Sequence, residues 1–223
     1  MVNELAVSAL FDLSKTIAAD IFDGLEYPWQ ALPLLKKFIL ALGEKLPEDA
    51  YERRDGGIYI SRSAKIYPSA YLEGPLIVDE GAEIRHSAFI RGSAIVGKFA
   101  VVGNSTELKN CLLFDKVQVP HYNYVGDSIL GYKAHMGAGA ITSNVRSDKK
   151  NVVVHAASGD IETGLRKFGA MLADEVEVGC NAVLNPGVVL GRGVWVYPTS
   201  LVRGVVPAMH VVKDGGRIAQ RRT

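Results

Sequence analysis

The stretch AEIRHSAFIRGSAIVGKFAVV, residues 82–102, decides the fold because its hydrophobic residues recur every six positions. The full series of aliphatic positions is Ile66, Leu72, Val78, Ile84, Ile90, Val96, Val102 and Leu108. Two positions before each lies a second series of mostly small residues, Ala64, Ala70, Leu76, Ala82, Ala88, Ala94, Ala100 and Thr106. Side chains two residues apart share one face of a strand. Each group of six therefore predicts a short strand with both of these side chains pointing inward.

The other positions of each group are rich in Gly, Ser, Pro, Asn and Asp, which favour turns. Three groups close one triangular coil, and coils stack about 4.8 Å apart. The repeat resumes at Val178, Leu184, Leu190, Val196 and Val202, preceded by Val176, Ala182, Val188, Val194 and Ser200. The period predicts a hexapeptide parallel β-helix, an all-β fold, which we expect to span residues 58–213.

Between the two blocks the repeat slips. Leu108 to Leu113 and Val125 to Leu130 are steps of five residues instead of six. These steps predict irregular corners, and His121 lies between them. Residues 143–175 lose the repeat altogether and gather charge, which predicts a long excursion from the prism. Excursions of that length are often functional.

Residues 1–50 are predicted to form an N-terminal helical segment. Apolar residues follow a mostly helical spacing over residues 4–22 and again over residues 29–42, with Pro28 suited to a first helical turn. We expect these helices to cover one end of the coil stack or to pack on a neighbouring subunit. The cap is the favoured interpretation, because the open ends of β-helices need cover.

Composition excludes several classes of protein. With 25 basic and 24 acidic residues the chain lacks the basic surplus of a dedicated nucleic-acid binder. Cys111 and Cys180 are its only cysteines, so neither a disulfide framework nor a thiolate metal site is indicated. The N-terminus does not resemble a signal peptide, and no stretch of 18 uninterrupted apolar residues occurs. We expect a soluble cytoplasmic protein with no membrane partner.

Two cations are predicted to stack on one side of the prism. Lys109 follows Arg91 after three groups of six, which is one full coil. Adjacent cations repel unless an anion lies beside them, and phosphate suits the double hydrogen bond of a guanidinium. The alternative is a solvated edge on which these cations pair with Glu73 or Glu107.

The break in the repeat surrounds a candidate general base. In VPHYNYVGDSILG, residues 119–131, His121 lies off the inward series, follows Pro120 and precedes Tyr124 by three residues. Imidazole exchanges protons near neutral pH, as a general base must. A lone histidine is more often structural, and His86 and His155 lack comparable neighbours. His135, Asn144 and Lys150 complete the group of candidate site residues.

Three segments carry a resemblance to a known family. GNSTELKN (103–110), VPHYNYVGDSILG (119–131) and MGAGAITSN (136–144) resemble the acetyltransferase half of the bifunctional glucosamine-1-phosphate acetyltransferase and N-acetylglucosamine-1-phosphate uridylyltransferase family. ITSNVRSDKKNV (141–152) and ETGLRKFGAML (162–172) are similar to the acetyltransferase domains of archaeal-type sugar-1-phosphate nucleotidylyltransferases. The resemblance covers roughly residues 58–213. It implies a left-handed β-helix and a homotrimer with sites between neighbouring prisms.

The resemblance also implies roles for individual residues. His121 would be the base, Arg91 and Lys109 would bind the sugar phosphate, and Tyr124 would be a further ligand of phosphate or sugar. Asn144 would hold the substrate or orient the histidine, and Lys150 would reach the phosphate from the excursion, across a subunit boundary. Contacts to acetyl-coenzyme A would come from Ala138, Cys180, Pro198 and Lys213. No metal is implied.

Two departures from the family pattern concern the amino sugar. His135 stands where the bacterial enzymes usually carry asparagine, and Val145 stands where they carry tyrosine, so the resemblance does not settle the sugar or the role of His135. No nucleotide-binding α/β domain precedes the prism, so uridylyl transfer is expected from a separate nucleotidyltransferase.

The expected activity is acetyl transfer from acetyl-coenzyme A to an amino-sugar 1-phosphate. One alternative is a different amine acceptor on the same scaffold, and another is a non-catalytic trimer that binds sugar nucleotide. A zinc-dependent hydratase is disfavoured, because His121 and His135 lack an obvious third histidine.

Overall fold

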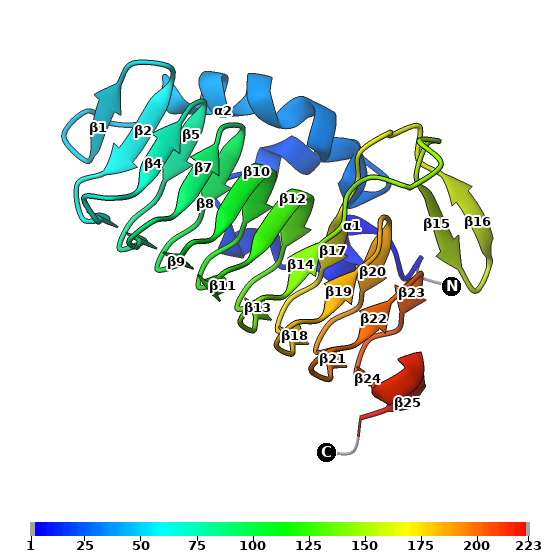
Figure 1. Ribbon diagram of the computed structural model, residues 1–223. Coiled ribbons are helices and arrows are strands. Elements are labelled where there is room, and N and C mark those ends of the chain that lie inside the picture. Colours follow the sequence, from blue (N-terminus) through cyan, green and yellow to red (C-terminus); the bar gives the residue numbers. More distant parts are fainter. Residues whose placement is uncertain (1–2, 222–223) are drawn as a thin grey trace.

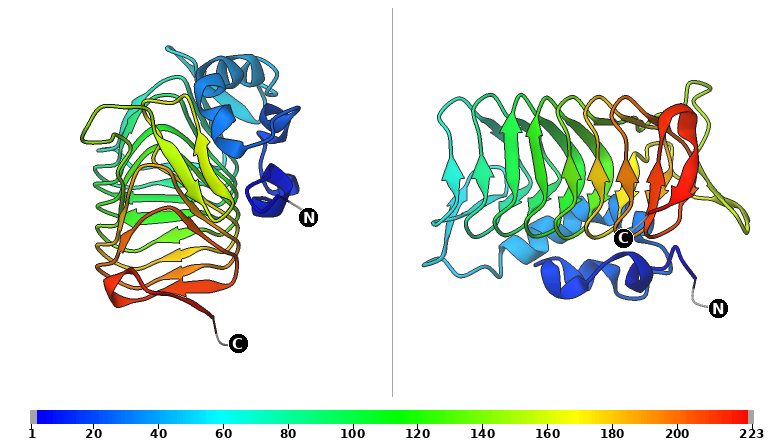
Figure 2. Two further views of the ribbon diagram at one scale, coloured as in Figure 1. Left: turned by 90° about the vertical axis from the view of Figure 1, so that its right-hand side faces the viewer. Right: turned by 90° about the horizontal axis from the view of Figure 1, so that it is seen from below.

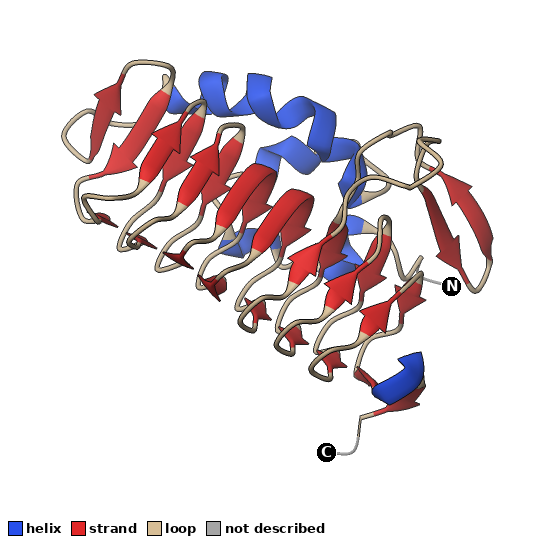
Figure 3. Cartoon of the chain, in the orientation of Figure 1, coloured by secondary structure: helices blue, strands red, loops and turns tan. Residues whose placement is uncertain are grey.

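The structure is a computed structural model that describes residues 3–221, and it confirms the parallel β-helix (Figure 1). Short strands wind into coils with three faces, and the strands of each face pair in parallel from one coil to the next (Figure 3). At the middle of the prism the strands β10 (Glu107–Leu113) and β12 (Tyr124–Leu130) each bend around one corner and contribute to two faces.

The first face contains β4 (Tyr71–Glu73), β7 (Phe89–Arg91), the first halves of β10 and β12, β14 (Ile141–Thr142), β19 (Val183–Leu184) and β22 (Leu201–Val202). The second face contains β2 (Ile58–Ser61), β5 (Leu76–Val78), β8 (Ala94–Val96), the second halves of β10 and β12, β17 (Ala170–Leu172), β20 (Val188–Leu190) and β23 (Val205–Val206). The third face contains β3 (Lys65–Ile66), β6 (Glu83–Ile84), β9 (Val101–Asn104), β11 (Gln118–His121), β13 (His135–Met136), β18 (Glu177–Val178), β21 (Trp195–Val196) and β24 (His210–Val212).

The core of the prism is built from the two predicted series. From Val78 to Leu108 every predicted aliphatic position is buried, and so is every small partner position from Leu76 to Thr106. The later block from Val176 to Val202 is buried as well. The six-residue period therefore identified the inward side chains correctly.

The strand register confirms the predicted slip. Ile84 pairs with Val102 at the spacing of three full groups of six, but Val102 pairs with Val119, where the spacing is shorter by one residue. Leu113 pairs with Leu130 at the same shortened spacing. Each five-residue step thus shortens a coil by one residue without interrupting the stack.

The N-terminal segment differs from the prediction in two respects. Residues 4–22 do not form one helix, but a single α-helical turn α1 (Val7–Leu10) and the 3₁₀ turns η1 (Leu13–Lys15) and η2 (Ala19–Phe22). The second predicted helix is present as the 3₁₀ helix η3 (Pro28–Leu34) followed by α2 (Leu35–Gly43). These elements lie along the second face, in contact with β5, β8, β10 and β12, and not over an end of the stack (Figure 2). The end-cap prediction was therefore wrong.

A stripe of outward-facing apolar residues explains this position. On the second face the middle residue of each strand points away from the prism interior, and these residues are nevertheless buried: Ile77, Ile95, Leu112, Ile129, Met171 and Val189. We call this set the outer stripe. Apolar residues of the helical segment, such as Trp29, Leu35 and Ile39, are buried in the same hydrophobic cluster. The segment thus removes the outer stripe from water.

The ends of the prism carry antiparallel strands. At the N-terminal end β1 (Tyr51–Arg54) pairs antiparallel with β2, and at the C-terminal end the turn η4 (Asp214–Gly216) leads into β25 (Ile218–Gln220), which pairs antiparallel with β24. No helix within residues 3–221 is long and apolar enough to cross a membrane.

The excursion leaves the prism after β14 and returns at β17. It carries a hairpin of β15 (Val153–Ala156) and β16 (Gly159–Glu162), which projects beside the C-terminal coils (Figure 1). β15 contacts β23, so the excursion follows the prism toward its C-terminal end. The regular repeat resumes at Ala170, before the predicted boundary at residue 175.

Candidate active site

The corner between the third and first faces has the same conformation in successive coils. One residue of each corner has a positive φ: Ser87, Ser105, Tyr122, Gly139, Asn181 and Thr199. The residue just before it in each coil is His86, Asn104, His121, Ala138, Cys180 and Pro198. The predicted base and three of the four predicted coenzyme positions therefore occupy one equivalent position.

Backbone hydrogen bonds link these corners. The N–H of Gly139 donates to the carbonyl of His121 at 3.0 Å, that of Asn181 to Ala138 at 2.8 Å, and that of Thr199 to Cys180 at 2.8 Å. At about 4.8 Å per coil, Pro198 lies about 14 Å from His121. We call His121, Ala138, Cys180 and Pro198 the corner column.

The imidazole at the head of the column is available to a ligand. His121 ends β11 and is exposed, and no group within residues 3–221 is hydrogen-bonded to its ring. Both nitrogens of this ring are therefore unpaired among the described residues.

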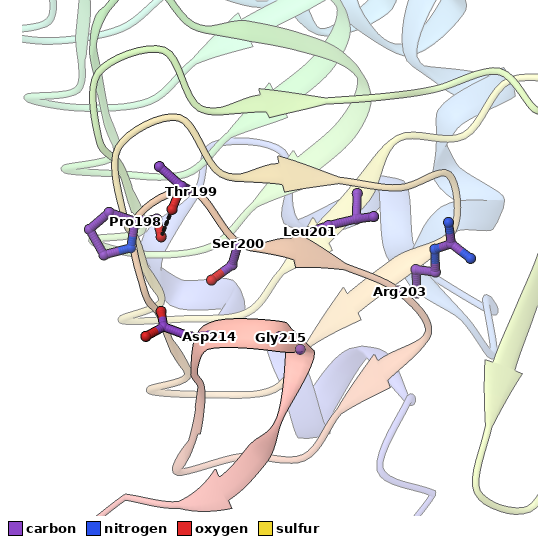
Figure 4. A pocket seen from close by; sticks show the side chains of 8 residues that line it. Pro198, Thr199, Ser200, Leu201, Arg203, Asp214 and Gly215 are labelled. Atoms are coloured by element: carbon purple, nitrogen blue, oxygen red, sulfur yellow. Dashed lines mark hydrogen bonds between the residues drawn. The ribbon is translucent and has the colours of Figure 1, made fainter.

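A cleft lies at the other end of the column. Its volume is about 690 Å³, and it is lined by Pro198, Thr199, Ser200, Leu201, Arg203, Asp214, Gly215 and Gly216 (Figure 4). Lys213, the fourth predicted coenzyme position, precedes the loop that forms one wall, and its N–H donates to the carbonyl of Arg217 at 2.9 Å. The column thus leads from an exposed imidazole to an open cleft.

The two predicted cations lie in successive coils of the first face, and each is paired with a carboxylate. Arg91 Nη1 donates to Glu107 Oε1 at 2.8 Å. Lys109 Nζ donates to both oxygens of Asp127, at 2.9 and 3.0 Å. The pairing of Arg91 with Glu107 was the alternative expected from the sequence, whereas Asp127 was missed. Neighbouring acids therefore offset the repulsion between the cations.

We call Arg91, Lys109 and their partners Glu107 and Asp127 the cation cluster, and Asp127 makes most of its hydrogen bonds. The side chain of Asp127 is 4% exposed. Besides Lys109 it accepts hydrogen bonds from Asn110 Nδ2 at 2.8 Å and from Asn144 Nδ2 at 2.5 Å. Asn144 also donates to the hydroxyl of Tyr124 at 3.2 Å. The structure thus brings Lys109, Tyr124 and Asn144 together through an acid that lies one coil beyond Lys109.

Tyr124 lies flat on the strand because residue 126 is a glycine. A Cβ at Gly126 would come within 2.5 Å of the Tyr124 hydroxyl. Burial, and then the negative charges of Asp127 and Glu107, raise the pKa of Tyr124 above its ordinary value. The side chain is therefore a neutral phenol at physiological pH, able to donate its proton to a bound anion.

Two predicted site residues lie apart from this cluster. His135 is on the third face, where its Nδ1 lies 2.8 Å from Glu177 Oε2. Lys150 lies in the excursion and is exposed; its backbone N–H donates to Asp148 Oδ1 at 3.1 Å. Within one chain the described residues do not bring either of them to the first face.

A protein-family model described as the GMPPB C-terminal domain matches residues 72–191, which is more than half of the chain. The chain belongs to this family. The matched segment includes the first three residues of the corner column, all of the cation cluster and the whole excursion. Membership of the GMPPB C-terminal domain family agrees with the family resemblance and the β-helix predicted from the sequence.

Two curated relatives illustrate the similarity. The bifunctional protein GlmU of Methanococcus aeolicus is 36% identical over 99 residues, covering 44% of this chain and 24% of that protein. The bifunctional sugar-1-phosphate nucleotidylyltransferase/acetyltransferase of Sulfurisphaera tokodaii is 36% identical over 98 residues, with the same coverage of 44% and 24%. The chain thus spans about a quarter of the length of these relatives.

Among solved structures, the acetyltransferase domain of PglB from Neisseria gonorrhoeae, in complex with acetyl coenzyme A, has 16% identity and a TM-score of 0.37. The match covers 72% of this chain and 56% of that one. A match of this quality adds nothing to the assignment.

Proposed function

We propose that this chain is an N-acetyltransferase that transfers the acetyl group of acetyl-coenzyme A to the amine of an amino-sugar 1-phosphate. Glucosamine 1-phosphate is the first candidate acceptor and galactosamine 1-phosphate the second. The observation that carries the proposal is the corner column, in which the imidazole of His121 is followed by three predicted coenzyme positions. The cation cluster lies on the adjacent face. The acetyltransferase activity named for the Sulfurisphaera relative supports it.

His121 performs the proton transfer in this mechanism. The acceptor ammonium gives a proton to the imidazole, and the free amine then attacks the thioester carbon. The carbon–sulfur bond breaks and coenzyme A leaves as a thiolate. The sugar nitrogen gives its second proton to that thiolate and keeps the acetyl group as an amide. A positioned base of this kind contributes about 10² to 10⁴-fold in rate.

We assign the backbone N–H of Ala138 as the donor to the oxyanion that forms when the amine attacks the thioester. The N–H of Gly137 donates to Val178 and that of Gly139 donates to His121. Among residues 3–221, no acceptor is paired with the N–H of Ala138. A backbone donor aimed at the developing negative charge stabilises the transition state.

Arg91 is the cation that a phosphate reaches most readily. Its side chain is 47% exposed and its partner Glu107 is 30% exposed, whereas Lys109 is 26% exposed and is held by a nearly buried Asp127. A phosphate can therefore replace Glu107 on Arg91 while Asp127 continues to hold Lys109 in place. Arg91 is assigned to direct phosphate binding, with Lys109 and Tyr124 beside it.

We also propose a homotrimer, with His135 or Lys150 of a neighbouring chain completing each site. The positions of these two residues away from the first face of their own chain support this arrangement. We further propose that a nucleotidyltransferase acts on the acetylated product, because the Sulfurisphaera relative is named for both activities.

The test is thiol release from acetyl-coenzyme A with glucosamine 1-phosphate, compared with galactosamine 1-phosphate, free glucosamine and a nucleotide-linked amino sugar. Activity should require the anomeric phosphate. His121→Ala should lose about 10² to 10⁴-fold in kcat. Arg91→Ala should raise KM for the sugar phosphate and leave KM for acetyl-coenzyme A nearly unchanged.

His86→Ala is the matched control for the base, because His86 occupies the equivalent corner position two coils before His121. It should keep full activity. An active His121→Ala enzyme would refute the assigned base. Equal turnover of free glucosamine would refute the phosphate requirement, and no turnover of any amine would favour a non-catalytic binding protein.

A further inference from the structure

Small residues line the inside of the corner that contains His121. Most of them are alanine, but where the coils shorten they are polar. One such residue directly precedes the first-face strand of each coil: Ala70, Ala88, Thr106, Asn123, Ala140, Ala182 and Ser200. Asn123 has the largest side chain of this set, and it is only 2% exposed. The sequence prediction did not single it out, although it lies two residues before the buried Val125.

The amide of Asn123 is almost fully hydrogen-bonded. Its Oδ1 accepts from the N–H of His121 at 3.1 Å. Its Nδ2 donates to the carbonyls of Gly137 at 2.8 Å and Ala140 at 3.0 Å. One side chain therefore holds the backbone of His121 and both ends of the corner that contains Ala138.

The corner itself does not require an asparagine. At residues 88, 140 and 182 the equivalent position is alanine, and those coils keep the same corner with its single positive-φ residue. A buried polar side chain contributes stability only while its hydrogen bonds are satisfied. Asn123 is hydrogen-bonded to two carbonyls and one N–H. These groups belong to the two coils that carry the proposed base and the proposed oxyanion donor.

We propose that Asn123 is a positioning residue that fixes the distance and orientation of His121 relative to Ala138. The inference rests on the proposed acetyl transfer, in which His121 takes a proton while Ala138 receives the thioester oxygen. Base and acyl group must be held in one geometry for transfer, and a displacement of about 1 Å can cost about 10²-fold in rate. Through Asn123 the two corners are held as one unit.

Asn123→Ala tests this role, because alanine is the residue that the chain itself uses at equivalent corners. We expect kcat to fall by about 10- to 100-fold, with KM for both substrates unchanged within about twofold. We also expect the deficit to shrink when the pH exceeds the pKa of the acceptor's ammonium group. At such a pH the amine is already free, so the placement of the base matters less.

Tyr51→Phe is the matched control for lost stability. The Tyr51 hydroxyl also makes a buried hydrogen bond, to Asp79 Oδ1 at 2.5 Å, far from His121 at the N-terminal end. The Tyr51→Phe variant should have a lower Tm and an unchanged kcat. A deficit in Asn123→Ala that stays constant with pH, or full kcat in this variant, would overturn the positioning role.

Failure of the proposed function can be told apart from failure of this inference. If the wild type transfers acetyl to no amine, the proposed function has failed. Crystal structures of the wild type and of Asn123→Ala then decide the inference alone. A His121 backbone that shifts relative to Ala138 in the variant supports the positioning role, and an unchanged corner contradicts it.

Discussion

Tyr124 and Gly126 show how one missing side chain prepares a binding surface. The ring lies over residue 126, and its hydroxyl reaches Asn144 at 3.2 Å. Because Gly126 does not have a positive φ, an alanine there introduces no backbone strain. The three atoms nearest to the added Cβ all belong to the Tyr124 side chain, which can move away. The position therefore affects the site more than the fold.

We predict that Gly126→Ala displaces Tyr124 and breaks its hydrogen bond with Asn144. A hydrogen bond of this kind contributes about 1 kcal/mol, so KM for the sugar phosphate should rise by about fivefold while Tm changes little. Steady-state kinetics with the sugar phosphate as the varied substrate measure the effect. In a Tyr124→Phe background the same substitution should add little, because the shared contact is already lost. Independent, additive effects would contradict this coupling.

At the residue scale the sequence predicted some site residues from spacing and missed others. The spacing of one full coil correctly placed Arg91 and Lys109 in successive coils. Asp127 was missed because it lies at the bend of β12, where the inward and outward alternation of a strand no longer indicates which side chain is buried. Asn123 does lie in the inward series, two residues before Val125, but the period alone did not show that its polar side chain forms hydrogen bonds there. Their roles depend on hydrogen bonds between coils, which the identity of a single residue does not reveal.

At the scale of elements, the second face explains both the success and the failure of the prediction for the N-terminal segment. The helical period of residues 29–42 reflected real burial, and η3 and α2 formed there. In residues 4–22 the side chain of Asp12 caps a 3₁₀ turn, and Arg192 Nε donates to the carbonyl of Leu10 at 3.2 Å. Tertiary contacts of this kind override a weak helical spacing.

The sequence also contains the information needed to predict that the helical segment packs on the second face. The residues of the outer stripe occupy the middle of three-residue strands, and polar residues would be expected there on an uncovered face. Tracing that middle position from coil to coil shows an unbroken apolar line from Ile77 to Val189. The prediction followed only the inward positions, so it assigned the helices to an end of the stack.

We predict that Leu112→Ala loosens the helical segment more than the prism. Leu112 is fully buried on the outer stripe, in a strand that contacts α2. Leucine truncation in a core costs about 2–5 kcal/mol, and here the loss falls on the contact between segment and prism. Hydrogen exchange should quicken in residues 28–43 while the strands of the prism keep their protection.

Leu108→Ala is the matched control for this prediction, because Leu108 lies in the same strand but points into the prism. Its truncation should instead reduce protection in the neighbouring coils. Equal loss of protection across helices and strands in both variants would show that segment and prism unfold as one unit.

At the scale of the whole molecule, the excursion separates Lys150 from the cluster it was predicted to join. Gly187 lies against Val152 and Gly204 against His155, so the chain beyond Lys150 runs beside the C-terminal coils. The Lys109 side chain is meanwhile held by Asp127. Within residues 3–221 no hydrogen bond or ion pair links Lys150 to this cluster, so we propose that it reaches the phosphate bound by a neighbouring chain.

Mixing two impaired variants tests this shared site. If each site takes His121 from one chain and Lys150 from its neighbour, randomly mixed trimers of His121→Ala and Lys150→Ala should regain up to about a quarter of wild-type activity. The measurement is thiol release after the two variants are co-refolded, with assembly checked by light scattering. His121→Ala mixed with Arg91→Ala is the control and should gain no activity over the two variants assayed separately, because these two residues flank the same face of one chain. Recovery in the control alone would place the subunit boundary between His121 and Arg91. No recovery in either mixture of a confirmed trimer would leave Lys150 outside the site.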